Sequence, residues 1–164
     1  MSNAGYNASM DGNLSATGMR FAIVSSRFNS AVTDRLVAGA RACLLEHGAH
    51  TADVVVFSVP GAWELPLAAR YLTAHGFDAI VAIGCVIRGD TPHFEYVAGA
   101  ATDGLANVQY ESGVPIGFGL LTVEDYEQAF ARAGGREGNK GWESALAALE
   151  MVHFPRRLSV HALP

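Results

Sequence analysis

The sequence has few of the features that mark secreted or membrane proteins. It contains only two cysteines, Cys43 and Cys85, and both fall inside apolar periodic segments, where a buried reduced thiol is expected rather than a disulfide. No apolar run reaches the roughly 18 residues of a membrane-spanning helix, and the N-terminus lacks the basic-then-apolar order of a secretory signal. We therefore expect a cytoplasmic protein with no membrane partner.

Charge is also scarce. Only 16% of the 164 residues are charged and the formal net charge is −5, so the chain offers no broad cationic surface to a nucleic acid. The six histidines show no metal-ligand spacing, and we predict no metal site. Glycine patterns of nucleotide-binding loops and the order of a Ser-His-Asp triad are absent as well.

Apolar residues, in contrast, are abundant. They make up 50% of the chain, which is high for a single domain of this length, and part of that surface is expected to be buried against other subunits. Four nearly continuous apolar runs, at 19–26, 53–59, 78–87 and 115–123, are typical of parallel strands covered on both faces.

Helical periodicity fills the intervals between these runs. Gly48, Gly76 and Gly113 lie where the first three helices should stop, and two further helices are expected, one ending at 134–135 and one over 139–151. The alternation predicts a three-layer α/β/α sandwich with a four-stranded parallel sheet and a flavodoxin-like topology.

One domain is expected at 19–154, between two terminal segments. Residues 1–18 are interpreted as a flexible arm that either adds a strand to a neighbouring subunit or stays disordered. Pro155 is expected to break the last helix and to begin an irregular tail over 155–164.

Three polar or aromatic segments follow predicted strands, at 25–29, 58–66 and 84–97. Ligands of open parallel sheets bind beyond the carboxyl ends of the strands, so these segments should converge on one rim.

From its residue types alone, the turn "IRGDTPH" has two compatible interpretations. Arg88, Gly89 and Thr91 at a helix start suit an anion such as phosphate, or else Asp90 or Thr91 merely caps the helix.

Several single residues also have two interpretations. His93 is either a proton shuttle or a surface or hydrogen-bonded histidine, and Glu64 is either a ligand or a carboxylate favoured by a helix N-terminus. Phe28 either packs on its own helix or stacks on a flat ring. Arg132, Lys140 and Glu143 flank "GREGNKG", which is either a solvated loop or an anion clamp.

Five sequence blocks, in this order along the chain, carry a resemblance to a known family: "SRFN", "PGAWELP", "GCVIRGDTPHFEYV", "GFGLLT" and "RAGGREGNKGWESALAALEM". Over residues 19–151 the chain resembles the lumazine synthase family of riboflavin biosynthesis. The resemblance implies condensation of 5-amino-6-(D-ribitylamino)uracil with 3,4-dihydroxy-2-butanone 4-phosphate to 6,7-dimethyl-8-ribityllumazine, phosphate and water, without cofactor or metal.

The resemblance also implies roles for individual residues. Phe28 would stack on the pyrimidine, and His93 would transfer protons. The other implied substrate-binding positions are Ala62, Trp63 and Glu64 for the ribityl chain, Val86 and Ile87 for the pyrimidine, Gly89, Asp90, Thr91 and Arg132 for the phosphate, Phe118 entering from the neighbouring subunit, and Lys140 and Glu143 nearby.

The same resemblance implies an oligomeric assembly and leaves other functions open. Family members are pentamers, some closed into icosahedral shells of sixty subunits, and the short "AGGREGNKG" favours the shell. A non-catalytic flavin or lumazine carrier, and a shell that encloses a partner such as riboflavin synthase, remain alternatives. A generic flavodoxin-like domain that binds FMN is disfavoured, because "SSRFNS" is a poor phosphate loop.

Overall fold

The computed structural model describes residues 14–160, and their centre is one parallel sheet. β1 (Phe21–Ser26), β2 (Val54–Val59), β3 (Ala79–Ile87) and β4 (Ile116–Val123) pair in the order β2-β1-β3-β4. The four strands predicted from the apolar runs are confirmed. β1 is buried along its whole length, as is most of β3, because both lie inside the sheet with helices on each face.

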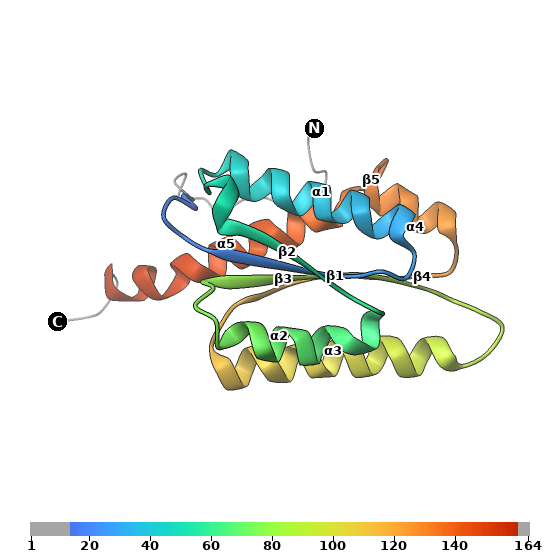
Figure 1. Ribbon diagram of the computed structural model, residues 1–164. Coiled ribbons are helices and arrows are strands. Elements are labelled where there is room, and N and C mark those ends of the chain that lie inside the picture. Colours follow the sequence, from blue (N-terminus) through green and yellow to red (C-terminus); the bar gives the residue numbers. More distant parts are fainter. Residues whose placement is uncertain (1–13, 161–164) are drawn as a thin grey trace.

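Helices cover both faces of the sheet (Figure 1). α1 (Ser30–Glu46), α4 (Tyr126–Arg132) and α5 (Lys140–Val160) lie on one face, and α2 (Leu65–Thr73) and α3 (His93–Ser112) lie on the other. Each face has its own apolar cluster, one including Phe21, Leu36 and Leu149 and the other including Leu65, Ile80 and Leu105. The three-layer α/β/α sandwich is confirmed.

Glycine sets the distance between α1 and α5. A Cβ on Gly141, in the first turn of α5, would overlap the backbone carbonyl of Leu36 in α1. Gly117 of β4 similarly faces the backbone carbonyl of Ser144. At both positions the backbones approach so closely that only glycine fits.

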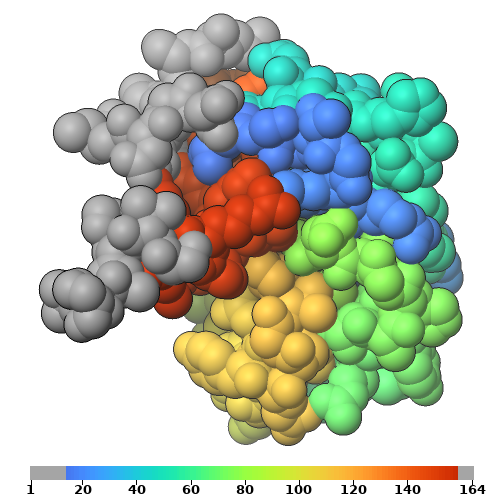
Figure 2. Space-filling view, turned by 90° about the vertical axis from the view of Figure 1, so that its left-hand side faces the viewer, coloured from blue at the N-terminus to red at the C-terminus, as the bar shows by residue number. Residues whose placement is uncertain are grey.

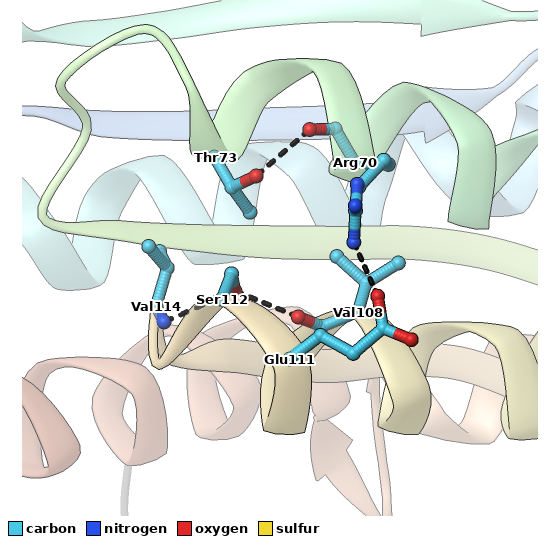
Figure 3. Close-up of polar contacts among 6 residues, drawn as sticks. All are labelled: Arg70, Thr73, Val108, Glu111, Ser112 and Val114. Carbon is cyan, nitrogen blue, oxygen red and sulfur yellow. Dashed lines mark hydrogen bonds and ion pairs between the residues drawn. The ribbon is translucent and has the colours of Figure 1, made fainter.

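On the opposite face, α2 and α3 lie side by side and are linked at their outer surface (Figure 3). Arg70 of α2 forms an ion pair with Glu111 of α3. At the helix ends the Thr73 hydroxyl donates to the Arg70 carbonyl over 2.8 Å, and the Ser112 hydroxyl donates to the Val108 carbonyl over 2.7 Å. These bonds satisfy carbonyl groups in the last turns.

The expected break at Pro155 is wrong. α5 continues through this proline to Val160, so at least residues 155–160 are helical rather than an irregular tail. Proline fits the helical φ, but it removes one backbone hydrogen bond and its ring crowds the carbonyl four residues earlier. This part of α5 projects from the body, where the helix has room to bend and water can bind that carbonyl (Figure 1).

The N-terminal boundary also differs from the expected one. Residues 14–18 pack against the domain: Ala16 is buried and donates its N–H to the His47 carbonyl over 2.8 Å. His153 of α5 binds the Ser15 carbonyl over 2.8 Å, and Figure 2 shows this end of the molecule, with the first described residues (blue) beside α5 (red). The proposed strand pairing of the arm falls on residues 1–13, outside the described residues.

A small hairpin replaces the expected loop before α5. α4 ends at Arg132, and β5 (Ala133–Gly135) and β6 (Gly138–Asn139) pair antiparallel. The hairpin is possible because Gly134 and Gly138 adopt φ values of 98° and 77°, which side chains disfavour. Two short 3₁₀ turns, η1 (Thr51–Asp53) and η2 (Ala62–Glu64), complete the chain. Among residues 14–160, no helix has both the length and the apolar character needed to cross a bilayer.

Candidate active site at the carboxyl ends of the strands

A cavity of about 530 Å³ lies at the carboxyl ends of β1, β2 and β3. The three rim segments singled out from the sequence all contribute to it, as the rule for open parallel sheets predicts. Its lining consists of Phe28, Asn29, Pro60, Gly61, Ala62, Trp63, Glu64, Cys85, Val86, Ile87, His93, Val97 and Tyr126. The mixture of aromatic rings, apolar walls and a few polar groups suits a flat organic molecule with hydroxyl groups.

Phe28 presents its ring to the cavity. It lies two residues after the end of β1 and is 73% exposed, so the ring does not pack on its own helix. The backbone on both sides is held: Arg27 donates its N–H to the Val59 carbonyl over 2.9 Å, and Asn29 adopts φ 59°. Asparagine tolerates this left-handed conformation better than most residues. The geometry leaves the ring free to stack on a planar ligand.

The segment after β2 adds an aromatic ring and a carboxylate. Gly61 precedes η2, whose three residues Ala62, Trp63 and Glu64 all line the cavity. One oxygen of Glu64, Oε2, accepts the Gly61 N–H over 2.8 Å, which confirms the structural role at a helix start. Among the described residues Oε1 has no hydrogen-bond partner, so Glu64 retains an acceptor for a ligand hydroxyl.

The end of β3 and the start of α3 form the remaining wall. Val86 and Ile87 are half-buried, and His93, the first residue of α3, is exposed at the cavity. Because the first N–H groups of any helix have no acceptor within that helix, this wall combines an imidazole with free backbone donors. The arrangement can bind an anion and transfer protons beside it.

The turn that connects β3 to α3 does not cap the helix. Pro92 occupies the N-cap position and no side chain caps there, so the interpretation of Asp90 or Thr91 as a cap is wrong. Gly89, Asp90 and Thr91 are exposed and stand outside the cavity lining. A carboxylate at Asp90 and a hydroxyl at Thr91 are thus free to meet a ligand beyond the cavity mouth.

Arg88 is engaged elsewhere. Its guanidinium pairs with Glu95, binds Glu124 through Nε over 2.8 Å, and lies 4.3 Å from the centre of the Phe94 ring. The hydrogen bond that Arg88 donates to Glu95 raises the pKa of Arg88 and lowers the pKa of Glu95. With two carboxylates beside it, Arg88 adds little positive charge to the phosphate turn, contrary to the expectation from its position.

A second cavity, of about 430 Å³, lies beside β4, α4 and α5. It is lined by four more of the predicted site residues, Phe118, Arg132, Lys140 and Glu143. Lys140 forms an ion pair with Glu143 over 2.7 Å, whereas Arg132 donates to the Gln128 carbonyl over 3.2 Å and has no carboxylate partner in the described part of the chain. One chain therefore separates the predicted site into two cavities.

Sequence reasoning missed several residues of the first cavity, chiefly Asn29 and Tyr126. Tyr126 is the first residue of α4, and its hydroxyl binds Asn29 over 2.9 Å. Asn29 lies in the block "SRFN", three residues after β1 ends, and this position close to a strand end was a usable signal. Nothing in the sequence places Tyr126 near it. The remaining missed lining residues are Pro60, Gly61, Cys85 and Val97.

The cavities offer no ligand set for a metal ion. Within residues 14–160 no group of three or more histidine, cysteine, aspartate or glutamate side chains is placed to hold one. Cys85 lines the first cavity, but burial raises the pKa of its thiol to about 11, which keeps it protonated at neutral pH. The titratable groups that can transfer protons near neutral pH in this cavity are therefore His93 and Glu64, beside the polar groups of Asn29, Trp63 and Tyr126.

The fold is that of a flavodoxin-like α/β protein, and its candidate small-molecule site lies at the carboxyl edge of the sheet. A sequence model described as 6,7-dimethyl-8-ribityllumazine synthase matches residues 18–156. The chain belongs to the 6,7-dimethyl-8-ribityllumazine synthase family.

Relatives with that name resemble the chain over most of its length. The protein of Aquifex aeolicus is 50% identical over 149 residues, covering 90% of this chain and 97% of that relative. That of Nitratidesulfovibrio vulgaris is 49% identical over 150 residues, covering 91% and 96%. That of Chloroherpeton thalassium is 47% identical over 150 residues, covering 91% and 97%.

Proposed function

We propose that this chain condenses 5-amino-6-(D-ribitylamino)uracil with 3,4-dihydroxy-2-butanone 4-phosphate to form 6,7-dimethyl-8-ribityllumazine, phosphate and water. This is the penultimate step of riboflavin biosynthesis and is a transferase reaction that uses no cofactor. Family membership supports the proposal. The observation that carries it is the first cavity, in which an exposed phenylalanine ring, a carboxylate with a free oxygen and a histidine at a helix start face one space.

The heterocycle end of the site is assigned to the first cavity. Phe28 stacks on the pyrimidine, and the backbone of Val86 and Ile87 binds its polar edge. Glu64 accepts hydrogen bonds from the ribityl hydroxyls through Oε1, beside Ala62 and Trp63. An aromatic platform and a few acceptors suffice to orient a flat polar ring with a polyol chain.

The phosphate end is assigned to the turn that contains Gly89, Asp90 and Thr91, and to Arg132. Backbone N–H groups at the start of α3 and an arginine without a carboxylate partner both favour a dianion. Because Arg132 and Phe118 line the second cavity of the same chain, we place them in the site of a neighbouring subunit. Lys140 and Glu143 then lie beside that composite site.

The chemistry needs positioning and proton transfer. The amino group of the uracil attacks the ketone of the butanone phosphate and water leaves to give an imine. Loss of phosphate, rearrangement of the resulting enol, and attack of the ribityl-bearing nitrogen with loss of a second water then close the ring. Each step moves a proton, and His93 at the cavity is placed to accept and return it.

Assembly follows from a composite site. A pentamer brings the second cavity of one subunit to the first cavity of the next. We place this assembly in the cytoplasm, with closure into an icosahedral shell as the larger assembly and riboflavin synthase as its proposed cargo. Exposed aromatic residues on outer helix faces, among them Tyr71 and Tyr96, support burial against other subunits. Sedimentation velocity would distinguish monomer, pentamer and shell.

The test of the reaction uses the purified full chain with both substrates. Formation of the fluorescent lumazine faster than in the absence of protein supports the synthase. Product at the spontaneous rate, from a folded protein that still binds the lumazine, identifies a carrier instead and overturns the proposal. Because the uncatalysed condensation proceeds slowly, the control without protein is part of every measurement.

A further inference from the structure

The side-chain amide of Asn29 joins three elements around the first cavity. Its Nδ2 donates to the Cys85 carbonyl of β3 over 2.9 Å, and its Oδ1 accepts from the Tyr126 hydroxyl of α4 over 2.9 Å. Asn29 itself follows Phe28 and begins α1, because the N–H groups of Val32 and Thr33 bind its carbonyl. One residue thus ties the loop that carries Phe28 to both neighbouring walls.

Phe28 depends on this attachment. Its ring is 73% exposed, and it has no aromatic partner in the described part of the chain, so side-chain packing does not hold it. The flanking backbone does, through the bond from Arg27 to Val59 on one side and through Asn29 on the other. Movement of Asn29 would therefore move the stacking platform.

The tyrosine is itself fixed without help from Asn29. Its ring stacks on Phe130 with the ring centres 6.2 Å apart and the planes inclined by 27°. Phe130 in turn lies beneath the Arg35 guanidinium, 4.9 Å from its ring centre. Because the ring is already fixed, the hydroxyl binds Asn29 with little further loss of side-chain entropy. Tyr126 is 53% exposed and therefore contributes little to the hydrophobic core.

We propose that the Tyr126 hydroxyl is a positioning group that, through Asn29, holds Phe28 in the orientation that stacks on the heterocycle. The assignment rests on the proposed function, because it takes the lumazine-type ring as the ligand of Phe28. The proposed role of Tyr126 concerns only how the lumazine-type ring binds. The phosphate end and the proton transfers at His93 do not depend on it.

The test is Tyr126→Phe, which removes only the hydroxyl and keeps the ring stacked on Phe130. Binding of 6,7-dimethyl-8-ribityllumazine, measured by calorimetry, is expected to weaken roughly three- to tenfold, the effect of one lost hydrogen bond. The KM for the uracil substrate should rise similarly, while the KM for the butanone phosphate and the thermal midpoint stay unchanged. Tyr110→Phe, which removes an equivalent hydroxyl at a 79% exposed position of α3, is the matched control and should leave binding unchanged.

A second variant shows whether the hydroxyl acts through Asn29. Asn29→Gly keeps the left-handed backbone and removes both side-chain hydrogen bonds, so Tyr126→Phe should have no further effect in that background. Additive losses would mean that the hydroxyl touches the ligand directly and would overturn the proposal, as would unchanged binding in Tyr126→Phe alone.

The closing experiment separates this inference from the reaction. If the wild type binds the lumazine but forms none above background, and Tyr126→Phe weakens binding, the positioning role stands and the proposed function fails. If the wild type binds no lumazine, both are overturned.

Discussion

The Tyr126 hydroxyl donates a hydrogen bond of 2.9 Å to the side-chain oxygen of Asn29, 97 positions earlier in the chain. The bond joins the first residue of α4 to the wall of the first cavity. The same helix ends at Arg132, which lines the second cavity. The seven residues of α4 therefore run from the first cavity, at Tyr126, to the second, at Arg132. The variants below address these two halves and the scaffold that holds them.

Replacement of His93 by alanine should slow turnover on the order of 100-fold without abolishing it. General acid–base catalysis contributes about this much at its lower end, and the condensation also proceeds unaided. Product formation under saturating substrates gives kcat, and lumazine binding should be unchanged because the stacking residues remain. Complete loss of product in a variant that still binds the lumazine would contradict a role limited to proton transfer.

Arg132→Ala should raise the KM for the butanone phosphate about tenfold or more, because a charge-assisted hydrogen bond to the phosphate is lost. The KM for the uracil substrate should change little. Arg136→Ala is the matched control, since this exposed arginine pairs loosely with Glu127 and Glu137 and lines neither cavity. Equal saturation curves for Arg132→Ala and wild type would remove Arg132 from the site.

Gly141→Ala should destabilise the fold by about 3 kcal/mol, because the added methyl group meets the Leu36 carbonyl and forces α1 away from α5. Gly99→Ala, where a Cβ meets open space within α3, should instead be neutral or stabilise by about 0.5 kcal/mol. Urea unfolding of both variants measures the difference. Similar midpoints would show that the close helix contact is not limiting.

Arg70→Ala should lower stability by no more than about 0.5 kcal/mol, although it removes an ion pair between two helices. Both side chains are largely in water, at 55% and 63% exposure, so the Coulomb energy is screened. Urea unfolding in low and high salt is the measurement. A loss above about 2 kcal/mol, or a strong dependence on salt, would show that the pair holds α2 on α3.

The free energy of unfolding should fall at alkaline pH because both cysteine thiols are buried. Burial raises the pKa of Cys43 to about 12 and that of Cys85 to about 11, from an ordinary value of 9.0. The folded protein therefore keeps protons that the unfolded chain releases, so this stability is complete below pH 9 and falls as pH rises through the folded pKa values. Within that window each thiol contributes a slope of about 1.4 kcal/mol per pH unit.

Unfolding of wild type and Cys43→Ala near pH 8 and near pH 10.5 measures this slope, which should be shallower in the variant. Iodoacetamide should also modify the native protein slowly at pH 8.5 and the urea-unfolded chain rapidly. Rapid alkylation of the native state would show that the thiols are accessible and that burial does not control their pKa.

Much of the fold was predictable because its signals are local. A strand covered on both faces must be apolar at every position, so β1 and β3 stood out as continuous runs. Helix faces were equally visible through their periodicity, and Gly48, Gly76 and Gly113 do adopt left-handed φ values just after the helices. The error at Pro155 arose because a proline inside a helix can kink the helix instead of ending it, and α5 continues past Pro155.

The site was predictable in part. Rim segments could be grouped because strands of a parallel sheet end at one edge, and the first cavity contains Phe28, Glu64 and His93 as this rule requires. The neutralisation of Arg88 was not visible, because Glu124 lies 36 positions away and reaches it only across the sheet edge. Cap geometry at Pro92 also depends on the path of the whole turn.

The order of apolar and polar residues by itself determined the class of fold, the number of strands in the main sheet and the chemical character of its rim, since burial and strand direction follow from local composition. Tertiary structure alone decided which distant groups meet, as Tyr126 does with Asn29 and Arg88 with Glu124. It also decided that the predicted site residues of one chain line two separate cavities. The physical reason is that such pairings depend on how helices pack across the sheet, and no periodicity along the chain records that distance.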